Sequence, residues 1–315
     1  MLVACSLLHA HRDYRSGMAS SIIIPWIFYI QILTISSKAI DAVPAIIVFG
    51  DSSIDTGNNN YLPTFAKCNF EPYGRDFPGG TPTGRFCNGR LPPDFVSEGL
   101  GLKPIVPAYL DPTFNISDFA TGVCFGSSGT GYDNSTAAIL KWNSSRITKP
   151  NYEPILVMKK ANEVISEALY IISVGTNDFL INYYNFPQRR TQFTIPKYED
   201  FLIGNAEDFI RKIYSLGARK LSLTGLPPMG CLPLQRTLNL KNPHSCSEER
   251  NKVAFEFNEK LKASVVKLMI ELPGLKVLYV DVYELLSRLI TRPSRYGKFL
   301  MDTHLNMYGI RWDKD

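Results

Sequence analysis

The chain has 315 residues, of which 45% are hydrophobic and 20% charged, values typical of a globular protein with one large or two ordinary domains. Its 22 glycines and 21 prolines follow no repeat, which excludes collagen-like and low-complexity chains. The formal net charge is +5 without a basic cluster, so nothing indicates binding to nucleic acid.

The N-terminal region has the pattern of a secretory signal peptide. Residues 21–35 are apolar and uncharged, but the run is shorter than the ~20 residues that span a bilayer. Ser37 and Ala39 follow it as small residues at the −3 and −1 positions of a cleavage site. We therefore expect residues 1–39 to be removed, with Met18 as the true start and no membrane span afterwards. A membrane anchor is the alternative.

Three N-glycosylation sequons follow this leader. They begin at Asn115, Asn134 and Asn143. Sequons are glycosylated only in proteins that enter the secretory route, so several of them behind a leader support secretion. We expect an extracellular or cell-wall protein.

The cysteines indicate one disulfide and no metal site. Five cysteines remain after residues 1–39, so at least one thiol is free or pairs outside the chain. Cys231 and Cys246 flank a proline-rich loop and are the best disulfide candidates. No Cys/His cluster has the spacing of metal ligands, so we expect no metal.

Five short apolar runs, each ending in Gly or Asp, predict buried strands. Helical periodicity over residues Tyr198–Leu216 and Glu248–Leu272 separates the later runs, and this alternation predicts a parallel sheet. Residues 40–315 therefore read as one α/β domain, with a Pro- and Gly-rich insertion over 58–107. The predicted strands are Ala45–Phe49, Thr121–Phe125, Tyr170–Val174, Leu221–Thr224 and Lys276–Val280.

Residues capable of acyl chemistry follow three of these strands. Ser52 follows the first strand, Gly129 and Gly131 the second, and Asn177 the third. Ligands of open parallel sheets bind beyond the carboxyl ends of the strands, so these residues are expected to meet. A serine becomes a nucleophile when a base takes its proton, and backbone N–H groups or an amide stabilise an oxyanion. Ordinary turn and helix-cap roles are the alternative.

Ordered sequence blocks support the acyl chemistry. They read FGDSSIDTGNNN from residue 49, PYGRDF from 72, PTGRF from 82, GVCFGSSGTGY from 122, GTND from 175 and LPPMGCLP from 226. Together they resemble the plant GDSL esterase/lipase family of SGNH hydrolases, with Cys124 where that family usually has Asn. The resemblance runs from Pro44 to Gly297.

The resemblance implies a fold and roles. The family fold is a three-layer α/β/α sandwich around a five-stranded parallel sheet. Ser52 would be the nucleophile. The oxyanion hole would combine its own backbone N–H, that of Gly131 (Gly129 as the alternate) and the side-chain amide of Asn177. Asp51 would orient the turn. Substrates would be acyl esters of lipids, cutin-like material or acetylated wall sugars, with no cofactor.

The family's last block, D-x-x-H, has no match. Outside the leader the histidines are His244, in a loop, and His304, which follows Asp302 with D-x-H spacing. The sequence departs from the family pattern after Gly297, so we expect a C-terminally incomplete domain. Asp302, or alternatively Asp281, and His304 are the candidate acid and base. We expect little or no hydrolysis of a short-chain aryl ester. A catalytically dead binding homologue or a truncated gene product is the alternative.

Overall fold

The computed structural model describes residues 43–139, 161–239, 242 and 245–296. It divides into two units, Met1–Ala42 and Val43–Asp315, and the fold below belongs to the second. The expected leader, Asn143, His244, Asp302 and His304 lie outside the described residues. Within the described residues, every helix is too short or too polar to cross a membrane.

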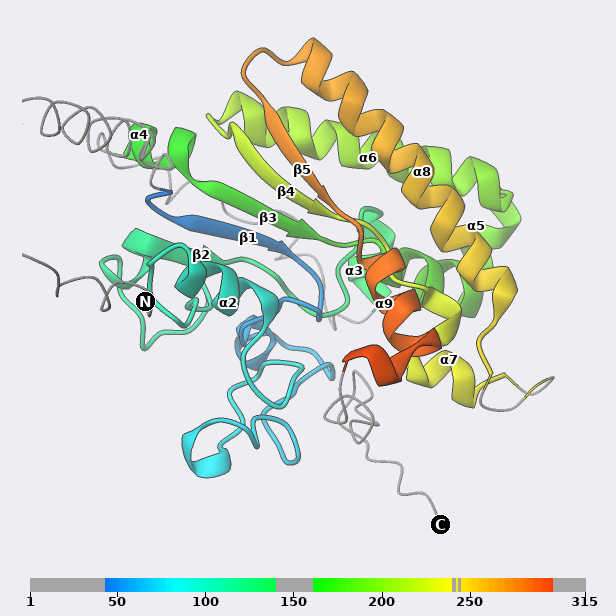
Figure 1. The fold of residues 1–315 in the computed structure, drawn as a ribbon, viewed down its shortest axis with the longest axis horizontal. Helices are drawn as coiled ribbons and strands as arrows, with labels where there is room; N and C mark the ends of the chain where they lie inside the picture. Colours follow the sequence, from blue (N-terminus) through cyan, green and yellow to red (C-terminus); the bar gives the residue numbers. More distant parts are fainter. Residues whose placement is uncertain (1–42, 140–160, 240–241, 243–244, 297–315) are drawn as a thin grey trace, which may run out of the picture. The chain divides into compact units, whose positions relative to one another are not determined.

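A five-stranded, all-parallel sheet forms the centre of the domain (Figure 1). Its strands run in the order β2-β1-β3-β4-β5, so β1 lies inside the sheet between β2 and β3. Each strand begins within one residue of its predicted start, which confirms the α/β prediction. The strands are β1 (Ile46–Gly50), β2 (Gly122–Cys124), β3 (Leu169–Ser173), β4 (Lys220–Thr224) and β5 (Lys276–Val280).

Two hydrophobic cores lie on opposite faces of this sheet. Successive side chains of a strand point to opposite faces, so Ile47 and Phe49 of β1 enter the larger core while Ile46 and Val48 enter the smaller one. Burial of β1 on both faces explains its continuous apolar run.

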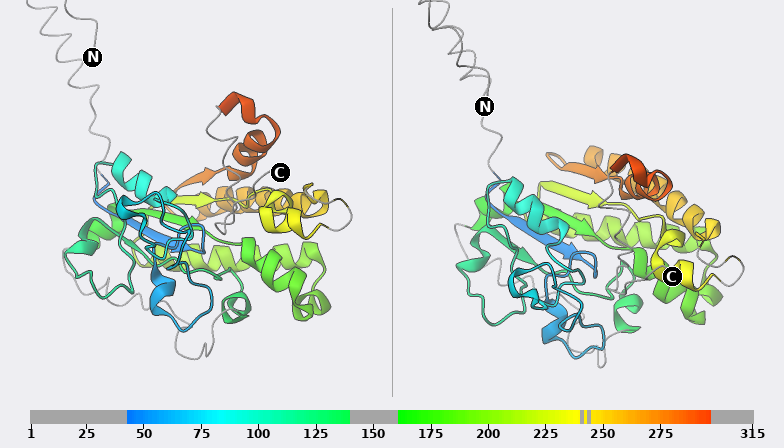
Figure 2. Two further views of the ribbon diagram at one scale, coloured as in Figure 1. Left: turned by 90° about the horizontal axis from the view of Figure 1, so that it is seen from below. Right: turned by 60° about the horizontal axis from the view of Figure 1, so that its bottom comes forward.

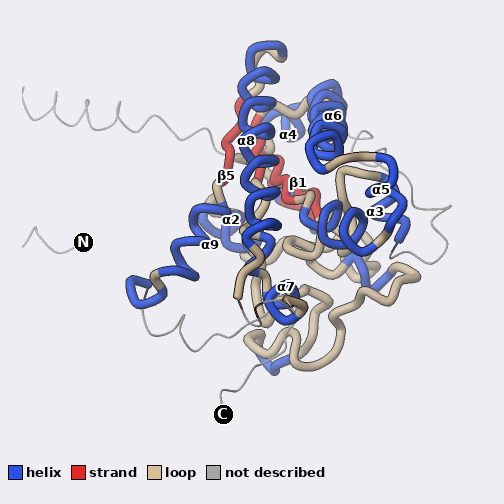
Figure 3. Tube along the Cα trace, turned by 90° about the vertical axis from the view of Figure 1, so that its right-hand side faces the viewer, coloured by secondary structure: helices blue, strands red, loops and turns tan. Residues whose placement is uncertain are grey.

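Helices cover both cores and make three layers (Figures 1 and 2). The long helices α6 (Ile195–Ser215) and α8 (Glu248–Glu271) bury apolar side chains in the larger core and run side by side (Figure 3). The shorter α4 (Ala161–Glu167) contributes Ile165 to the same core. Helix α2 (Pro92–Gly99) contacts β1, and Leu100 directly after it packs on the smaller core.

The Pro- and Gly-rich insertion is ordered by a buried ion pair. The Nε of Arg85 lies 3.1 Å from Oδ2 of Asp94, whose Oδ1 accepts the N–H of Val106 at 2.8 Å. Asp94 also belongs to α2, a helix that the sequence analysis did not predict. Pro92 and Pro93 occupy the first turn of that helix, where proline is tolerated because the N–H groups there need no intrahelical acceptor.

The strand β5 differs from the prediction that it would be buried on both faces. Leu278, in its middle, is 66% exposed, and α9 (Val282–Thr291) after it has no buried residue. Strand β5 is the last in the sheet order, so its outer edge and one face are open in the described part of the chain.

Shorter elements connect the layers. Cys231 and Cys246, the pair favoured by the sequence, are joined by a disulfide that precedes α8. The remaining elements are η1 (Asn58–Tyr61), η2 (Pro78–Gly80), η3 (Asp118–Thr121), α3 (Asn134–Ile139), the π-helix η6 (Asp178–Tyr183), α5 (Pro187–Gln192), η7 (Met229–Cys231), α7 (Pro233–Thr237) and η8 (Pro293–Tyr296).

Candidate active site

The strand order predicts a ligand crevice at the carboxyl ends of β1 and β3. From β1 the chain crosses to β2 on one side, and later returns to β3 on the other. Ligands of open α/β sheets bind at such a switch point, outside the carboxyl ends of the strands. Ser52 follows β1 and Asn177 follows β3, so the two residues flank this point.

The turn that carries Ser52 is pinned to the end of β3. The N–H of Asp51 donates to the Ser173 carbonyl at 3.1 Å, and the Ser53 and Ser173 hydroxyls lie 3.1 Å apart. At Gly50 a Cβ would lie 2.0 Å from the Ser173 carbonyl oxygen, so only glycine allows this close approach. Asp51 accepts the N–H of Ser53 at 2.9 Å, which orients the turn.

Ser52 itself keeps its polar groups available. Its side chain is half-buried, and within the described part of the chain neither its hydroxyl nor its N–H makes a hydrogen bond. The Gly131 N–H is likewise without an acceptor among the described residues. Two backbone donors and one hydroxyl are therefore free to contact a substrate.

The glycine-rich turn after β2 is bound to the segment after Ser52. Asp55 accepts the N–H of Ser128 at 3.0 Å, and its other oxygen accepts the N–H groups of Gly57 and Asn58. The Asn58 amide donates to the carbonyls of Cys124 at 2.9 Å and Gly126 at 2.7 Å. These bonds fix the turn relative to the Ser52 loop.

Cys124 fits its position as a neutral thiol. It is fully buried, its Sγ donates to the Ile54 carbonyl at 3.1 Å, and it accepts the Gly126 N–H at 3.3 Å. Burial raises the pKa of this thiol to about 11, so it carries no charge at neutral pH.

Thr130 connects all three parts of the site. Its hydroxyl donates to the Gly50 carbonyl at 2.7 Å, at the end of β1. Its carbonyl accepts the Asn177 Nδ2 at 2.9 Å. An amide nitrogen carries two hydrogens, so the second hydrogen of Asn177 remains for an oxyanion. Sequence reasoning missed Thr130, because these two bonds join segments far apart in the chain.

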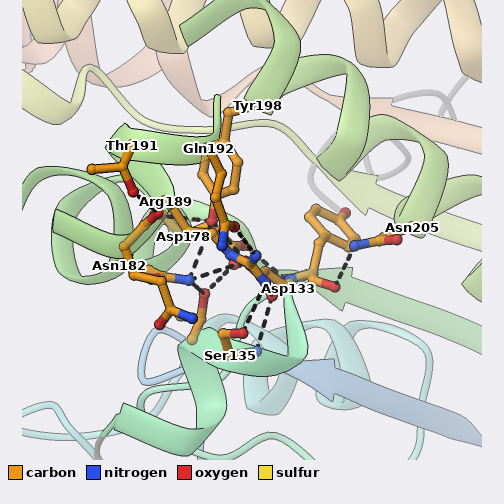
Figure 4. A network of polar contacts seen from close by, with 12 residues as sticks. Asp133, Ser135, Asp178, Asn182, Arg189, Thr191, Gln192, Tyr198 and Asn205 are labelled. Carbon is orange, nitrogen blue, oxygen red and sulfur yellow. Dashed lines mark hydrogen bonds and ion pairs between the residues drawn. The ribbon is translucent and has the colours of Figure 1, made fainter. Parts of the chain in front are cut away.

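Asp178, next to Asn177, holds the residues after Gly131 (Figure 4). Its Oδ2 accepts the N–H of Tyr132 at 2.8 Å. Its Oδ1 accepts the N–H of Asp133 at 3.0 Å and the hydroxyl of Thr136 at 2.5 Å. This fully buried carboxylate was not singled out from the sequence.

A second carboxylate, Asp133, directly precedes α3 and binds α5. The Arg189 guanidinium binds it through two hydrogen bonds, of 2.7 and 2.9 Å, and the Tyr198 hydroxyl donates to it at 3.1 Å (Figure 4). Asn182 donates to it at 3.1 Å. Burial raises the pKa of Asp133, but the hydrogen bonds from Arg189, Ser135 and Tyr198 and the charge of Arg189 together outweigh burial and lower this pKa overall.

Burial also shifts the carboxyls nearest the site. It raises the pKa of Asp51 and of Asp55 to about 6, against the opposing effect of the N–H groups that they accept. It raises the pKa of Asp178 to about 7. These three groups bind protons in the folded chain at pH values where the unfolded chain has released them.

A pH dependence of stability follows from Asp178. Its pKa rises from 3.8 to about 7 on folding, so its contribution is fully present below pH 3.8 and is lost as the pH rises through about 7. Replacing it with Asn should make the fall in unfolding free energy between about pH 5 and pH 7 shallower by about 1.4 kcal/mol per pH unit. Urea unfolding at several pH values measures this, and an unchanged slope would contradict the shift.

The remaining residues predicted for the site have local structural roles or lie at the surface. Gly129 has a φ of +85°, which requires glycine in the turn. Asp281, the alternative acid, caps α9 by accepting the N–H of Glu284 at 2.9 Å and pairs with Lys262. Asn115 and Asn134 are exposed. The described residues contain no group of His, Cys, Asp and Glu that could hold a metal ion.

The five-stranded parallel sheet with helices on both faces fits the α/β fold of an SGNH-type hydrolase. Residues 46–313 match the family described as GDSL-like Lipase/Acylhydrolase. The GDSL esterase/lipase At2g42990 of Arabidopsis thaliana is 54% identical over 89% of this chain and 82% of the relative. A second Arabidopsis GDSL esterase/lipase, At2g04570, is 53% identical over 81% of this chain and 75% of the relative.

The chain therefore belongs to the GDSL-like lipase/acylhydrolase family and is a carboxylic ester hydrolase. Among solved structures, the lipase Lip_vut3 from a goat rumen metagenome aligns with a TM-score of 0.37 and 16% identity, over 77% of this chain and 82% of the other. That likeness is too distant to carry an argument about this site.

Proposed function

We propose that this protein is a secreted serine esterase or lipase whose nucleophile is Ser52. The observation that carries the proposal is the set of bonds around Thr130, which join the Ser52 loop, the glycine-rich turn and Asn177 at one edge of the sheet. The free N–H groups of Ser52 and Gly131, with the amide of Asn177, would form the oxyanion hole.

The reaction proceeds in two acyl-transfer steps. The Ser52 oxygen attacks the ester carbonyl carbon while a base takes its proton, and the carbonyl oxygen becomes an oxyanion. The intermediate collapses, the alcohol leaves with that proton, and the acyl group stays on Ser52. Water then attacks the acyl-enzyme by the same route, which releases the acid and restores the serine.

The acyl substrates proposed are esters of lipids, cutin-like material or acetylated wall sugars. A series of p-nitrophenyl esters from acetate to palmitate, with an acetylated polysaccharide, tests the proposal. A maximum of kcat/KM at long chains supports a lipase, and a maximum at acetate supports an esterase for acetylated sugars. Stoichiometric ester binding without any hydrolysis would instead support a binding homologue.

For the base and the acid we propose His304 and Asp302. Their D-x-H spacing is one residue shorter than that of the family, so turnover is expected to be slow. His304→Ala should lower the remaining kcat/KM further, because Ser52 then has no group to take its proton. His244→Ala is the matched control and should leave it unchanged. Equal rates for wild type and His304→Ala would contradict this assignment.

Secretion is proposed from the leader pattern and the sequons, two of which start at exposed asparagines. Expression in a eukaryotic secretory host should give a mature N-terminus near residues 40–43. Enzymatic deglycosylation should reduce the mass, and Asn115→Gln and Asn134→Gln should each remove one glycan. Full-length protein that stays in the membrane fraction with residues 1–39 attached would contradict secretion.

A further inference from the structure

We infer that Asp178 is a positioning residue for the oxyanion hole: its carboxylate holds the turn after Gly131 so that the Gly131 and Asn177 donors face one site. The inference rests on the proposed function, and it adds a role for a residue that does not itself touch the substrate.

Two consecutive residues, Asn177 and Asp178, bind three residues that flank Gly131. Asn177 binds the Thr130 carbonyl, while Asp178 binds the N–H groups of Tyr132 and Asp133. Both residues stand at the start of η6, directly beyond β3. The position of Gly131 relative to the Asn177 amide is therefore set on both sides of Gly131.

The contact between Asp178 and Gly131 leaves no room for adjustment. A Cβ at residue 131 would lie 2.1 Å from Oδ1 of Asp178, well inside contact distance. Asp178 is fully buried within the protein, so it cannot turn away into solvent. The turn thus packs directly on the carboxylate, which accepts the N–H groups of Tyr132 and Asp133.

Proton uptake by Asp178 would weaken this hold. The Thr136 hydroxyl and two backbone N–H groups face it. The titratable and charged groups around it are Asp133, Arg189, Tyr132 and Tyr198. Burial raises the pKa of Asp178 to about 7, and a protonated carboxyl accepts fewer hydrogen bonds than a carboxylate.

Asp133 supplies a matched control. It is buried in the same network and directly precedes α3, but its carboxylate binds Arg189 and Tyr198 (Figure 4) rather than the N–H groups after Gly131. Asp133→Asn and Asp178→Asn are the same chemical change. A merely structural role predicts that both variants lose activity in proportion to their loss of stability.

The experiment compares the two variants by thermal melting, by ester hydrolysis and by the rate of labelling with an alkyl fluorophosphonate. Asp178→Asn should lower kcat and the labelling rate by about 10²-fold with little change in KM, the size expected for a lost oxyanion donor. Asp133→Asn should lower the melting temperature and leave both rates within about threefold of wild type. Equal losses in the two variants would overturn the inference.

If Asp178→Asn folds poorly, a double-mutant cycle measures the coupling between Gly131 and Asp178. Gly131→Ala forces a Cβ onto the carboxylate, so its effect should depend on Asp178. The double variant Gly131→Ala/Asp178→Asn should be about as slow as either single variant, whereas additive losses would overturn the inference. Wild type that is labelled no faster than Ser52→Ala would refute the proposed function instead, and the inference with it.

Discussion

Replacing Ser52 with Ala is expected to reduce kcat/KM for p-nitrophenyl acetate by about 10⁴-fold, or to the background rate where wild-type turnover is slower than that. The reason is chemical: without the hydroxyl no acyl-enzyme forms, and only binding and the oxyanion donors remain. Ser52 makes no hydrogen bond to the rest of the described chain, so its removal should leave the melting temperature nearly unchanged.

The adjacent Ser53 is the matched control. Its hydroxyl lies 3.1 Å from that of Ser173, at the end of β3, and so belongs to the turn rather than to the crevice. Ser53→Ala should keep most of the hydrolytic rate while lowering the melting temperature slightly. A loss of activity in Ser53→Ala that equals the loss in Ser52→Ala would mean that the wrong serine has been assigned.

Asn177→Ala is expected to lower kcat by about 10²- to 10³-fold, as removal of one preorganised oxyanion donor does. The effect should fall on kcat rather than KM, because the charge on the carbonyl oxygen develops only in the transition state. Asn177→Ala also removes the hydrogen bond to the Thr130 carbonyl. Because that bond fixes the turn before Gly131, its loss should lower kcat further.

A second buried asparagine of the same helix provides the comparison. Asn182 lies in η6 and donates to Asp133 and Thr136, so it faces the network rather than the crevice. Asn182→Ala should destabilise the fold and leave kcat close to that of wild type. Steady-state kinetics of the two variants separates the roles, and a larger loss of kcat in Asn182→Ala would contradict the assignment of Asn177.

The sheet was predictable because its signal is local. Runs such as residues 45–49 are apolar throughout, and burial on both faces of a central strand demands that composition. The open face of β5 was not predictable. Leu278 is apolar, as buried residues usually are, and its exposure depends on whether another element packs against that face of β5. Helix α2 was hidden because its opening prolines resemble those of a loop.

The site was predictable only where residues follow strand ends. Ser52 and Asn177 could be placed because parallel strands bring their carboxyl ends to one edge. Thr130 and Asp178 could not, because their roles lie in hydrogen bonds to partners on other segments, and no local pattern marks such bonds. Asp302 and His304 lie outside the described residues, so their pairing with Ser52 is a proposal from the sequence.

The measurement that most directly tests this account is the site of covalent labelling by an alkyl fluorophosphonate, mapped by tandem mass spectrometry of the folded chain. The account predicts one modified residue, Ser52, with the label absent from Ser52→Ala and present in Ser53→Ala. Labelling of Ser53 or of another serine, or no labelling of a chain shown to be folded, would contradict Ser52 as the nucleophile.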